Sequence, residues 1–263
     1  MKKNTIVLYA DPASRASVAG LAAEFTRALG PLAGIIDIVD TDAAALRNGT
    51  AIDDRTLAFV LPGIVGEDSL YHAHLGAEGN EALRRYVQDG GVFMGLCAGA
   101  YYAATTIEYV PEWAPPRGRN SGILALFNGV ARGPVPGTGI AGDTPGAYNG
   151  CTLAPVVLLE DGERAALPYS CGPAFYTPGE NAEVLARYDV PGQPVAAFSE
   201  ASGKGRIILS GVLPQYGVPD CWRMPVNPKP LDHLLEKIKP HEAARRCLWD
   251  RMVEIVTRHH ALT

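Results

Sequence analysis

The chain has 263 residues, 47% of them hydrophobic, and a formal net charge of -5. This length and hydrophobic content are enough to bury a full core in one large α/β domain. The negative balance, with no block rich in Lys and Arg, argues against a nucleic acid or a membrane surface as partner.

The cysteines and the apolar runs exclude further classes of protein. The five cysteines include no Cys-x-x-Cys pair, so neither a disulfide framework nor a zinc site is expected, and we predict no metal and no cofactor. No apolar run approaches the ~18 residues of a membrane span. The first apolar run ends at Asp11, too soon for a secretory signal. The expected location is therefore the cytoplasm.

Apolar stretches alternate with helical patterns through the first hundred residues. We expect strands at 6–9, 34–39, 57–61 and 92–96, and helices at 14–29, 42–47 and 80–88. Continuously apolar strands are typical of parallel strands buried on both faces. The alternation of strand and helix therefore predicts a parallel sheet with helices on both faces.

In the second half of the chain the strands and helices no longer alternate. Short apolar stretches separated by Gly and Pro predict strands at 123–127, 153–159, 164–168, 184–188, 195–198 and 206–209, with a hairpin turn at 200–205. From 231 to 260 the pattern is helical again, interrupted at Pro240. We predict one domain over residues 1–230, and a C-terminal helical extension of the same domain over 231–263.

One cysteine lies in a turn that is typical of enzyme nucleophiles. Cys97 is the centre of a Gly-x-Cys-x-Gly turn between an apolar strand and a helix that begins at Ala98. Such a turn pushes its central side chain out at the top of the sheet, and the flanking glycines permit close backbone packing. The N–H groups of the following helix favour a thiolate. The alternative interpretation is a buried structural cysteine.

Several other segments accompany this turn. They are Gly79-Asn80, the run Cys97-Ala98-Gly99-Ala100-Tyr101-Tyr102, Phe127 to Pro134, Cys171-Gly172-Pro173 and Gly203-Lys204-Gly205. Together they resemble the class I glutamine amidotransferase superfamily. More narrowly, they resemble the amidotransferase-like domain of biotin–protein ligases, which also occurs as stand-alone bacterial proteins. The resemblance covers about residues 1–220. It implies a flavodoxin-like three-layer α/β sandwich with a mostly parallel central sheet.

The resemblance also implies a set of site residues. In working amidotransferases a cysteine attacks the glutamine side-chain amide, a histidine oriented by a glutamate moves the protons, and backbone N–H groups hold the oxyanion. Cys97 matches the nucleophile. The oxyanion donors would be the N–H of Ala98 and an N–H from the loop at Gly63 and Ile64. The family usually has Pro-Gly-Gly there, whereas this chain has Ile64 at the last position.

The histidine and glutamate of that set are missing. The His-Pro-Glu triplet of the superfamily is replaced by Leu213-Pro214-Gln215, and no histidine occurs between His74 and His233. Leucine accepts no proton, and loss of the base costs roughly 10²–10⁴-fold in such chemistry. We therefore expect a degenerate protein that does not hydrolyse glutamine. It would bind a small acyl or amide ligand, or regulate a partner.

Two alternatives stay open. Cys97 could serve an active thiol hydrolase or acyltransferase whose base is His72 or His74, since both follow the Pro62-Gly63 loop. The C-terminal helices could instead have a structural or assembly role, packing on the domain itself or on a second subunit. Candidate ligand contacts are Tyr101, Tyr102, Gly172 and Pro173, and we expect His259 and His260 to fray with the chain end.

Overall fold

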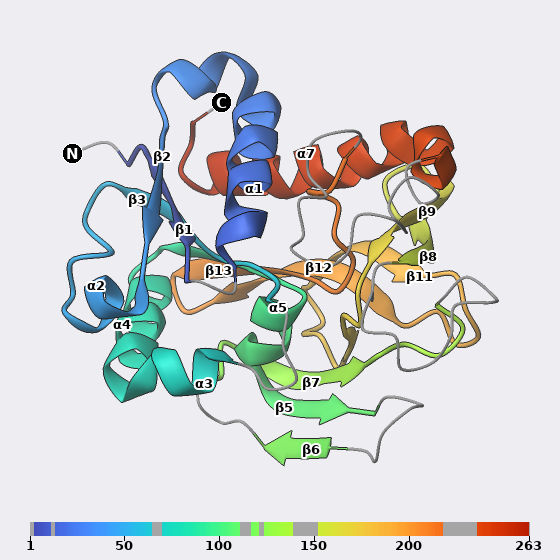
Figure 1. Cartoon of the computed structure of the whole chain (residues 1–263), viewed down its shortest axis with the longest axis horizontal. Helices are drawn as coiled ribbons and strands as arrows, with labels where there is room; N and C mark the ends of the chain where they lie inside the picture. Colours follow the sequence, from blue (N-terminus) through green and yellow to red (C-terminus); the bar gives the residue numbers. More distant parts are fainter. Residues whose placement is uncertain are drawn as a thin grey trace.

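The computed structural model describes residues 3–11, 14–64, 70–110, 117–120, 124–138, 152–217 and 236–262 (Figure 1). Its centre is a run of parallel strands in the order β2-β1-β3-β4-β13. Their bounds are β1 Thr5–Tyr9, β2 Asp37–Thr41, β3 Thr56–Leu61, β4 Val92–Leu96 and β13 Gly205–Ser210. The predicted α/β fold with a mostly parallel central sheet is thereby confirmed.

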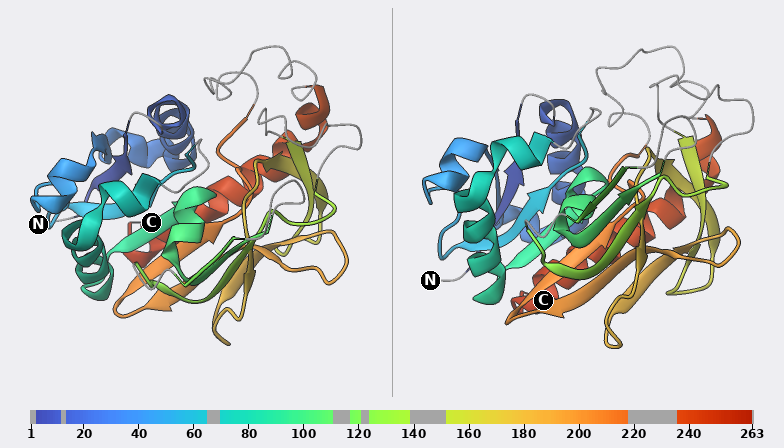
Figure 2. Two further views of the ribbon diagram at one scale, coloured as in Figure 1. Left: turned by 60° about the horizontal axis from the view of Figure 1, so that its bottom comes forward. Right: turned by 90° about the horizontal axis from the view of Figure 1, so that it is seen from below.

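Helices cover both faces of this sheet and form the outer layers. One face carries α1 (Arg15–Leu29) and α7 (Glu242–His259), and the other carries α2 (Ala43–Arg47), α3 (Leu70–His74), α4 (Gly76–Gln88) and α5 (Ala98–Ala103). Short 3-10 segments, η1 (Gly30–Gly34) and η2 (Lys239–His241), follow α1 and precede α7. Figure 2 shows α5 and α7 on opposite sides of the sheet.

Two hydrophobic cores result from the alternation of side chains along the buried strands. In β1, Ile6 and Leu8 belong to the core under α1 and α7, while Val7 and Tyr9 belong to the core under α4 and α5. Successive side chains of a strand point to opposite faces, so β1, β3 and β4 contribute to both cores. This requirement explains why these three strands are almost entirely apolar.

Mostly antiparallel strands extend the sheet beyond β13, with one parallel pair, β5 and β7. From β13 the order continues through β12, β10, β7, β5 and β6, while β11, β8 and β9 branch from β12. Their bounds are β5 Ala104–Tyr109, β6 Arg117–Asn120, β7 Phe127–Gly133, β8 Thr152–Leu158, β9 Arg164–Tyr169, β10 Ala174–Tyr176, β11 Glu183–Tyr188 and β12 Val195–Ser202. The hairpin expected at 200–205 joins β12 to β13, with Ser202 opposite Gly205.

Some boundaries differ from the sequence prediction. The second strand starts at Asp37 rather than at 34, because Gly30–Gly34 forms a 3-10 segment with a proline near its start. The strand expected at 123–127 instead begins at Phe127 and runs to Gly133. Buried and exposed residues alternate along this strand, so its sequence contains no continuous apolar run that would have marked it. The strand Ala104–Tyr109, directly after α5, was not predicted.

The C-terminal helix is part of the protein's own core. On α7 the apolar residues Leu248, Trp249, Met252, Val253, Ile255 and Val256 are all buried. The Trp249 ring packs edge-on against Phe25 of α1, with 4.8 Å between centroids. These contacts account for the apolar pattern without a second subunit.

The expectation that the last histidines fray is wrong. The Nε2 atom of His259 lies 3.1 Å from the carbonyl oxygen of Gly90, and that of His260 lies 2.8 Å from the carbonyl oxygen of Leu57. Both rings therefore bind backbone at the amino-terminal edge of the sheet, where strand ends leave carbonyl groups unpaired.

Candidate functional site

Cys97 occupies a strained turn between β4 and α5. Its backbone has φ 50° and ψ -105°, a region that residues with a side chain rarely adopt and that costs of order 1–3 kcal/mol. The Cys97 N–H donates to the carbonyl oxygen of Ser210 at 2.9 Å. A Cβ added to Gly99 would lie 2.0 Å from the carbonyl oxygen of Leu61, so only glycine fits there. Cys97 therefore lies in a tight turn between a buried strand and a helix.

The thiol of Cys97 faces the segment 170–173, which follows β9. The sulfur donates to the carbonyl oxygen of Ser170 at 3.2 Å, and the residue is 9% exposed. This hydrogen bond ties the cysteine turn to the segment after β9.

Tyrosine hydroxyls bind the next three carbonyl groups of the same segment. Tyr101 donates to the carbonyl of Cys171 at 2.9 Å, Tyr169 to that of Gly172 at 2.8 Å, and Tyr188 to that of Pro173 at 2.9 Å. Burial, reinforced by neighbouring ionisable groups including Cys97, raises the pKa of Tyr101 and Tyr188 well above the ordinary value. Both hydroxyls stay protonated and keep donating, so segment 170–173 forms a rigid wall beside the cysteine.

The loop after β3 and the segment after β13 meet at Cys97. A Cβ built on Gly63 would lie 3.3 Å from Cys97 Cβ, 3.9 Å from its sulfur and 4.0 Å from Leu213 Cδ2. This arrangement follows from the register that pairs Ser210 with Leu96, because both chains leave the sheet at the same level. The residues mapped to the oxyanion loop, the nucleophile and the absent histidine are thus neighbours in space. The side chain at the histidine position is a buried aliphatic group.

The rest of the triplet is also buried. Gln215 is 1% exposed, and its Oε1 atom has no hydrogen-bond partner in the described part of the chain. The Pro214 carbonyl accepts a hydrogen bond from Arg245 of α7. Arg245 is fully buried and is held by Glu242 at 2.7 and 2.8 Å and by Glu24 at 3.4 Å. Sequence reasoning missed Arg245, whose one signal was a charged residue within an apolar helical pattern.

The two histidines proposed as substitute bases have different neighbours. His72 packs edge-on against Tyr102, with 4.9 Å between ring centroids. His74 Nδ1 lies 3.5 Å from Oδ2 of Asp11, a carboxylate that is 4% exposed. Sequence reasoning did not single out Asp11 as a partner of His74.

The remaining candidate residues lie on both sides of the turn. Tyr101 faces the segment that contains Gly172 and Pro173, whereas the Tyr102 hydroxyl donates to Asn80 Oδ1 of α4 at 3.0 Å. Ala98, the first residue of α5, and Ile64 of the loop after β3 are partly buried against the core under α4 and α5. Tyr101 is thus closer than Tyr102 to the other candidate ligand contacts.

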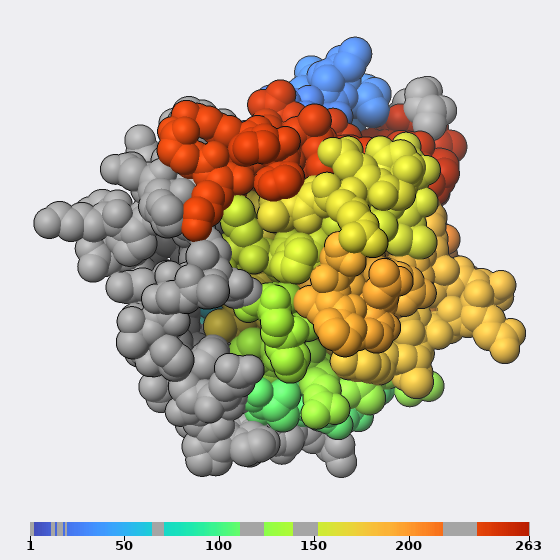
Figure 3. Space-filling view, turned by 90° about the vertical axis from the view of Figure 1, so that its right-hand side faces the viewer, coloured from blue at the N-terminus to red at the C-terminus, as the bar shows by residue number. Residues whose placement is uncertain are grey.

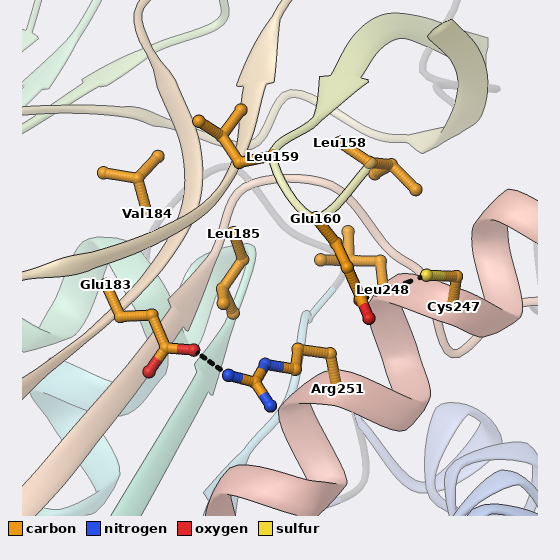
Figure 4. A pocket seen from close by; sticks show the side chains of 9 residues that line it. All are labelled: Leu158, Leu159, Glu160, Glu183, Val184, Leu185, Cys247, Leu248 and Arg251. Carbon is orange, nitrogen blue, oxygen red and sulfur yellow. Dashed lines mark hydrogen bonds and ion pairs between the residues drawn. The ribbon is translucent and has the colours of Figure 1, made fainter. Parts of the chain in front are cut away.

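Two surface cavities are lined by residues other than Cys97 and its neighbours in the turn. One of about 330 Å³ opens between α7, the end of β8 and the start of β11, and is lined by Leu185, Leu248, Arg251 and neighbouring residues (Figure 4). It lies on the face shown in Figure 3. Beside it Cys247 contacts Glu160, and burial together with this carboxylate raises the pKa of Cys247 to about 11. Its thiol therefore stays protonated near neutral pH, so the candidate nucleophile remains Cys97.

Neither a metal cluster nor a membrane span was found among the described residues. No group of three or more His, Cys, Asp or Glu side chains there is arranged to hold a metal ion. No helix in the described ranges is both long and apolar enough to cross a bilayer.

The strand order and the helix layers define a flavodoxin-like α/β fold. The chain superposes on a glutamine amidotransferase of Thermotoga maritima with a TM-score of 0.56 at 13% identity, covering 97% of this chain and 99% of that one. The family model described as biotin-protein ligase, N terminal, matches residues 3–258, and the chain belongs to this family. The match extends past the expected limit near residue 220 and includes nearly all of α7.

Two relatives match the chain in sequence, one of similar length and one much longer. It is 29% identical over 221 residues to an uncharacterized protein of Chlamydia muridarum, covering 79% of each chain. It is 24% identical over 170 residues to a biotin–protein ligase of Schizosaccharomyces pombe, covering 61% of this chain. That match spans 26% of the ligase, so the chain corresponds to about a quarter of its length.

Proposed function

We propose that this protein is an amidotransferase-like binding protein that keeps the nucleophile turn but has lost the proton-transfer pair. The observation that carries the proposal is the contact region of Gly63, Cys97 and Leu213, where an aliphatic side chain occupies the position of the base. A cysteine attack on an amide needs a group that takes and returns a proton. Leu213 supplies none, so glutamine hydrolysis stops at this step.

Two further features support ligand binding at the same place. The Oε1 atom of Gln215 is a buried acceptor without a hydrogen-bond partner in the described residues, and such a group commonly receives a donor from a ligand. The wall formed by segment 170–173 is held by tyrosine hydroxyls and so is rigid before any ligand arrives. A small acyl or amide compound with an N–H group fits these two features.

A glutaminase assay tests the loss of catalysis. We expect the wild-type protein to release glutamate from glutamine no faster than its Cys97→Ala variant. Restoring the pair with Leu213→His and Gln215→Glu should raise the rate at least ~10-fold, since one proton-transfer group is worth 10²–10⁴-fold. The same double change in a Cys97→Ala background is the matched control and should gain nothing. Robust wild-type turnover that disappears in Cys97→Ala would defeat the proposal.

A second candidate function has one specific observation in its favour. His74 Nδ1 faces the buried carboxylate of Asp11, the kind of pairing that orients a catalytic imidazole. On this alternative the protein is an active thiol hydrolase or acyltransferase with His74 as the base of Cys97. It requires fast alkylation of Cys97 by iodoacetamide at neutral pH, slowed by His74→Ala and unaffected by His72→Ala. An ordinary rate, equal in both variants, removes this candidate.

A further inference from the structure

Two buried polar atoms at the end of β1 lack hydrogen-bond partners. They are the hydroxyl of Tyr9, whose residue is fully buried, and Oδ2 of Asp11, whose residue is 4% exposed. This statement covers the part of the chain that the structure describes. A buried polar group without a partner is costly, and natural proteins retain few of them. Two such atoms, two residues apart, indicate a place where another molecule supplies the missing hydrogen bonds.

The Asp11 carboxylate is held in position by the protein itself. Its Oδ1 atom accepts from the Ser14 N–H at 2.7 Å, and the Asp11 N–H donates to Ser14 Oγ at 3.0 Å. These bonds fix the side chain and leave Oδ2 directed away from them. Nδ1 of His74 lies 3.5 Å from Oδ2. The carboxylate is therefore preorganised, with one oxygen available to a donor.

These atoms lie at the carboxyl end of β1. From β1 the chain enters α1 on one face, and from β3 it enters α3 on the other, while β1 and β3 are neighbours in the sheet. Open α/β sheets bind ligands at the carboxyl ends of the strands, at such a switch of direction. Asp11 follows β1, and His74 ends α3, so their pairing joins the two elements.

This end of β1 lies near the cysteine turn. The Tyr71 hydroxyl donates to the carbonyl of Pro62 at 2.6 Å, and its ring packs edge-on against Tyr9 at 5.5 Å. Pro62 directly precedes Gly63, and a Cβ built on Gly63 would lie 3.3 Å from Cys97 Cβ. Tyr71 thus links Tyr9 to the loop beside the thiol.

The local charge favours a cation. Burial raises the pKa of Tyr9, the carboxylates of Asp11 and Asp42 raise it further, and Arg47 opposes them. The Arg47 guanidinium donates to the carbonyl of His74. Two carboxylates act on the Tyr9 hydroxyl against one guanidinium, so an anionic group is repelled and a cationic donor is attracted.

We propose that Tyr9 and Asp11 form a binding subsite for the protonated primary amine of a small ligand. A primary ammonium carries N–H donors and a positive charge, which match one carboxylate oxygen and one phenolic oxygen. This subsite goes beyond the proposed function and does not depend on whether Cys97 is reactive.

Binding of ethylammonium chloride, followed by saturation-transfer NMR, tests the subsite. We expect a saturable signal with wild-type protein, at least ~10-fold weaker binding in Asp11→Asn, and no such signal with ethanol, which has the same shape without the charge. Asp37→Asn, an exposed carboxylate on β2, is the matched control and should bind like wild type. No saturable signal, or equal binding by Asp11→Asn, would overturn the proposal.

Tyr9→Phe gives a measurement that does not rely on the ligand. Removing a hydroxyl that has no partner should raise the Tm of the ligand-free protein by about 2–4 °C. A lower Tm would mean that the hydroxyl is satisfied in the free protein, and would count against the subsite. Cys97→Ala should leave ethylammonium binding unchanged, which separates this subsite from the fate of the proposed function.

Discussion

The thiol of Cys97 donates a hydrogen bond to the carbonyl oxygen of Ser170 at 3.2 Å, although 73 residues separate the two along the chain. The contact joins the turn after β4 to the wall formed by segment 170–173. Because the neighbouring carbonyls of that wall are also bound, the sulfur faces a fixed surface rather than a loop that adapts to it. A ligand of the proposed kind would therefore meet a preformed shape.

Backbone strain at Cys97 predicts an unusual order of stability between two variants. Cys97→Gly should be more stable than Cys97→Ala by about 1 kcal/mol, because only glycine adopts φ 50° without a steric cost. Urea denaturation of both variants measures the difference in the free energy of unfolding. Ala100→Gly in α5 is the control and should lose about 1 kcal/mol, as glycine in a helix does. Equal stability of the two Cys97 variants would show that the turn is unstrained.

The tyrosine contacts to segment 170–173 predict measurable stability losses. Tyr101→Phe and Tyr188→Phe should each lower the free energy of unfolding by about 1–2 kcal/mol, since each leaves a buried carbonyl group without its donor. Tyr176→Phe is the matched control, because this side chain is 41% exposed, and its effect should stay within about 0.5 kcal/mol. Losses no larger than the control's would mean that water replaces the lost hydroxyls.

Arg245 ties α7 to the segment that contains Pro214. Arg245→Met should lower the free energy of unfolding by about 3–5 kcal/mol, because it leaves the carboxylates of Glu24 and Glu242 without their buried counter-charge. Arg246→Met also removes a partner of Glu242, but from a half-exposed position, and should change stability by about 0.5 kcal/mol or less. Chemical denaturation of both variants checks the contrast. Similar effects in the two would contradict a structural role for burial of Arg245.

His260 predicts a loss of stability in mild acid. Burial, with smaller contributions from Lys3 and His259, lowers its pKa from 6.5 to about 4. Between these values the unfolded chain binds a proton that the folded chain does not, so stability falls as the pH drops through this window. Allowing for solvent screening of a half-buried ring, the loss is about 1–2 kcal/mol.

His260→Asn should flatten that dependence. Asparagine keeps an N–H group for the carbonyl of Leu57 but does not titrate. The free energy of unfolding of both proteins, measured from pH 4 to 8, gives the comparison. If the variant loses stability in acid as steeply as the parent, another group causes the effect.

Features that depend on neighbouring residues in the chain could be predicted from the sequence. The strand at 92–96 and the Cys97 turn were predicted to the residue, because hydrophobic runs and glycine spacing express local sterics. The absence of a histidine after β13 is likewise visible in the sequence, since that position is defined by a strand and the triplet that follows it. The parallel half of the sheet followed from the strand and helix alternation.

Contacts between residues far apart in the chain could be identified only from the tertiary structure. Arg245 and Pro214 meet because α7 crosses the sheet, and Asp11 meets His74 because two loops diverge at neighbouring strands. A sequence pattern shows that a residue is polar or apolar but not which atom faces it after folding. The replacement of the expected histidine and glutamate by Leu213 and Gln215 was thus visible in the sequence. The contacts of Asp11 and Arg245 were not, because they form only when distant segments pack together.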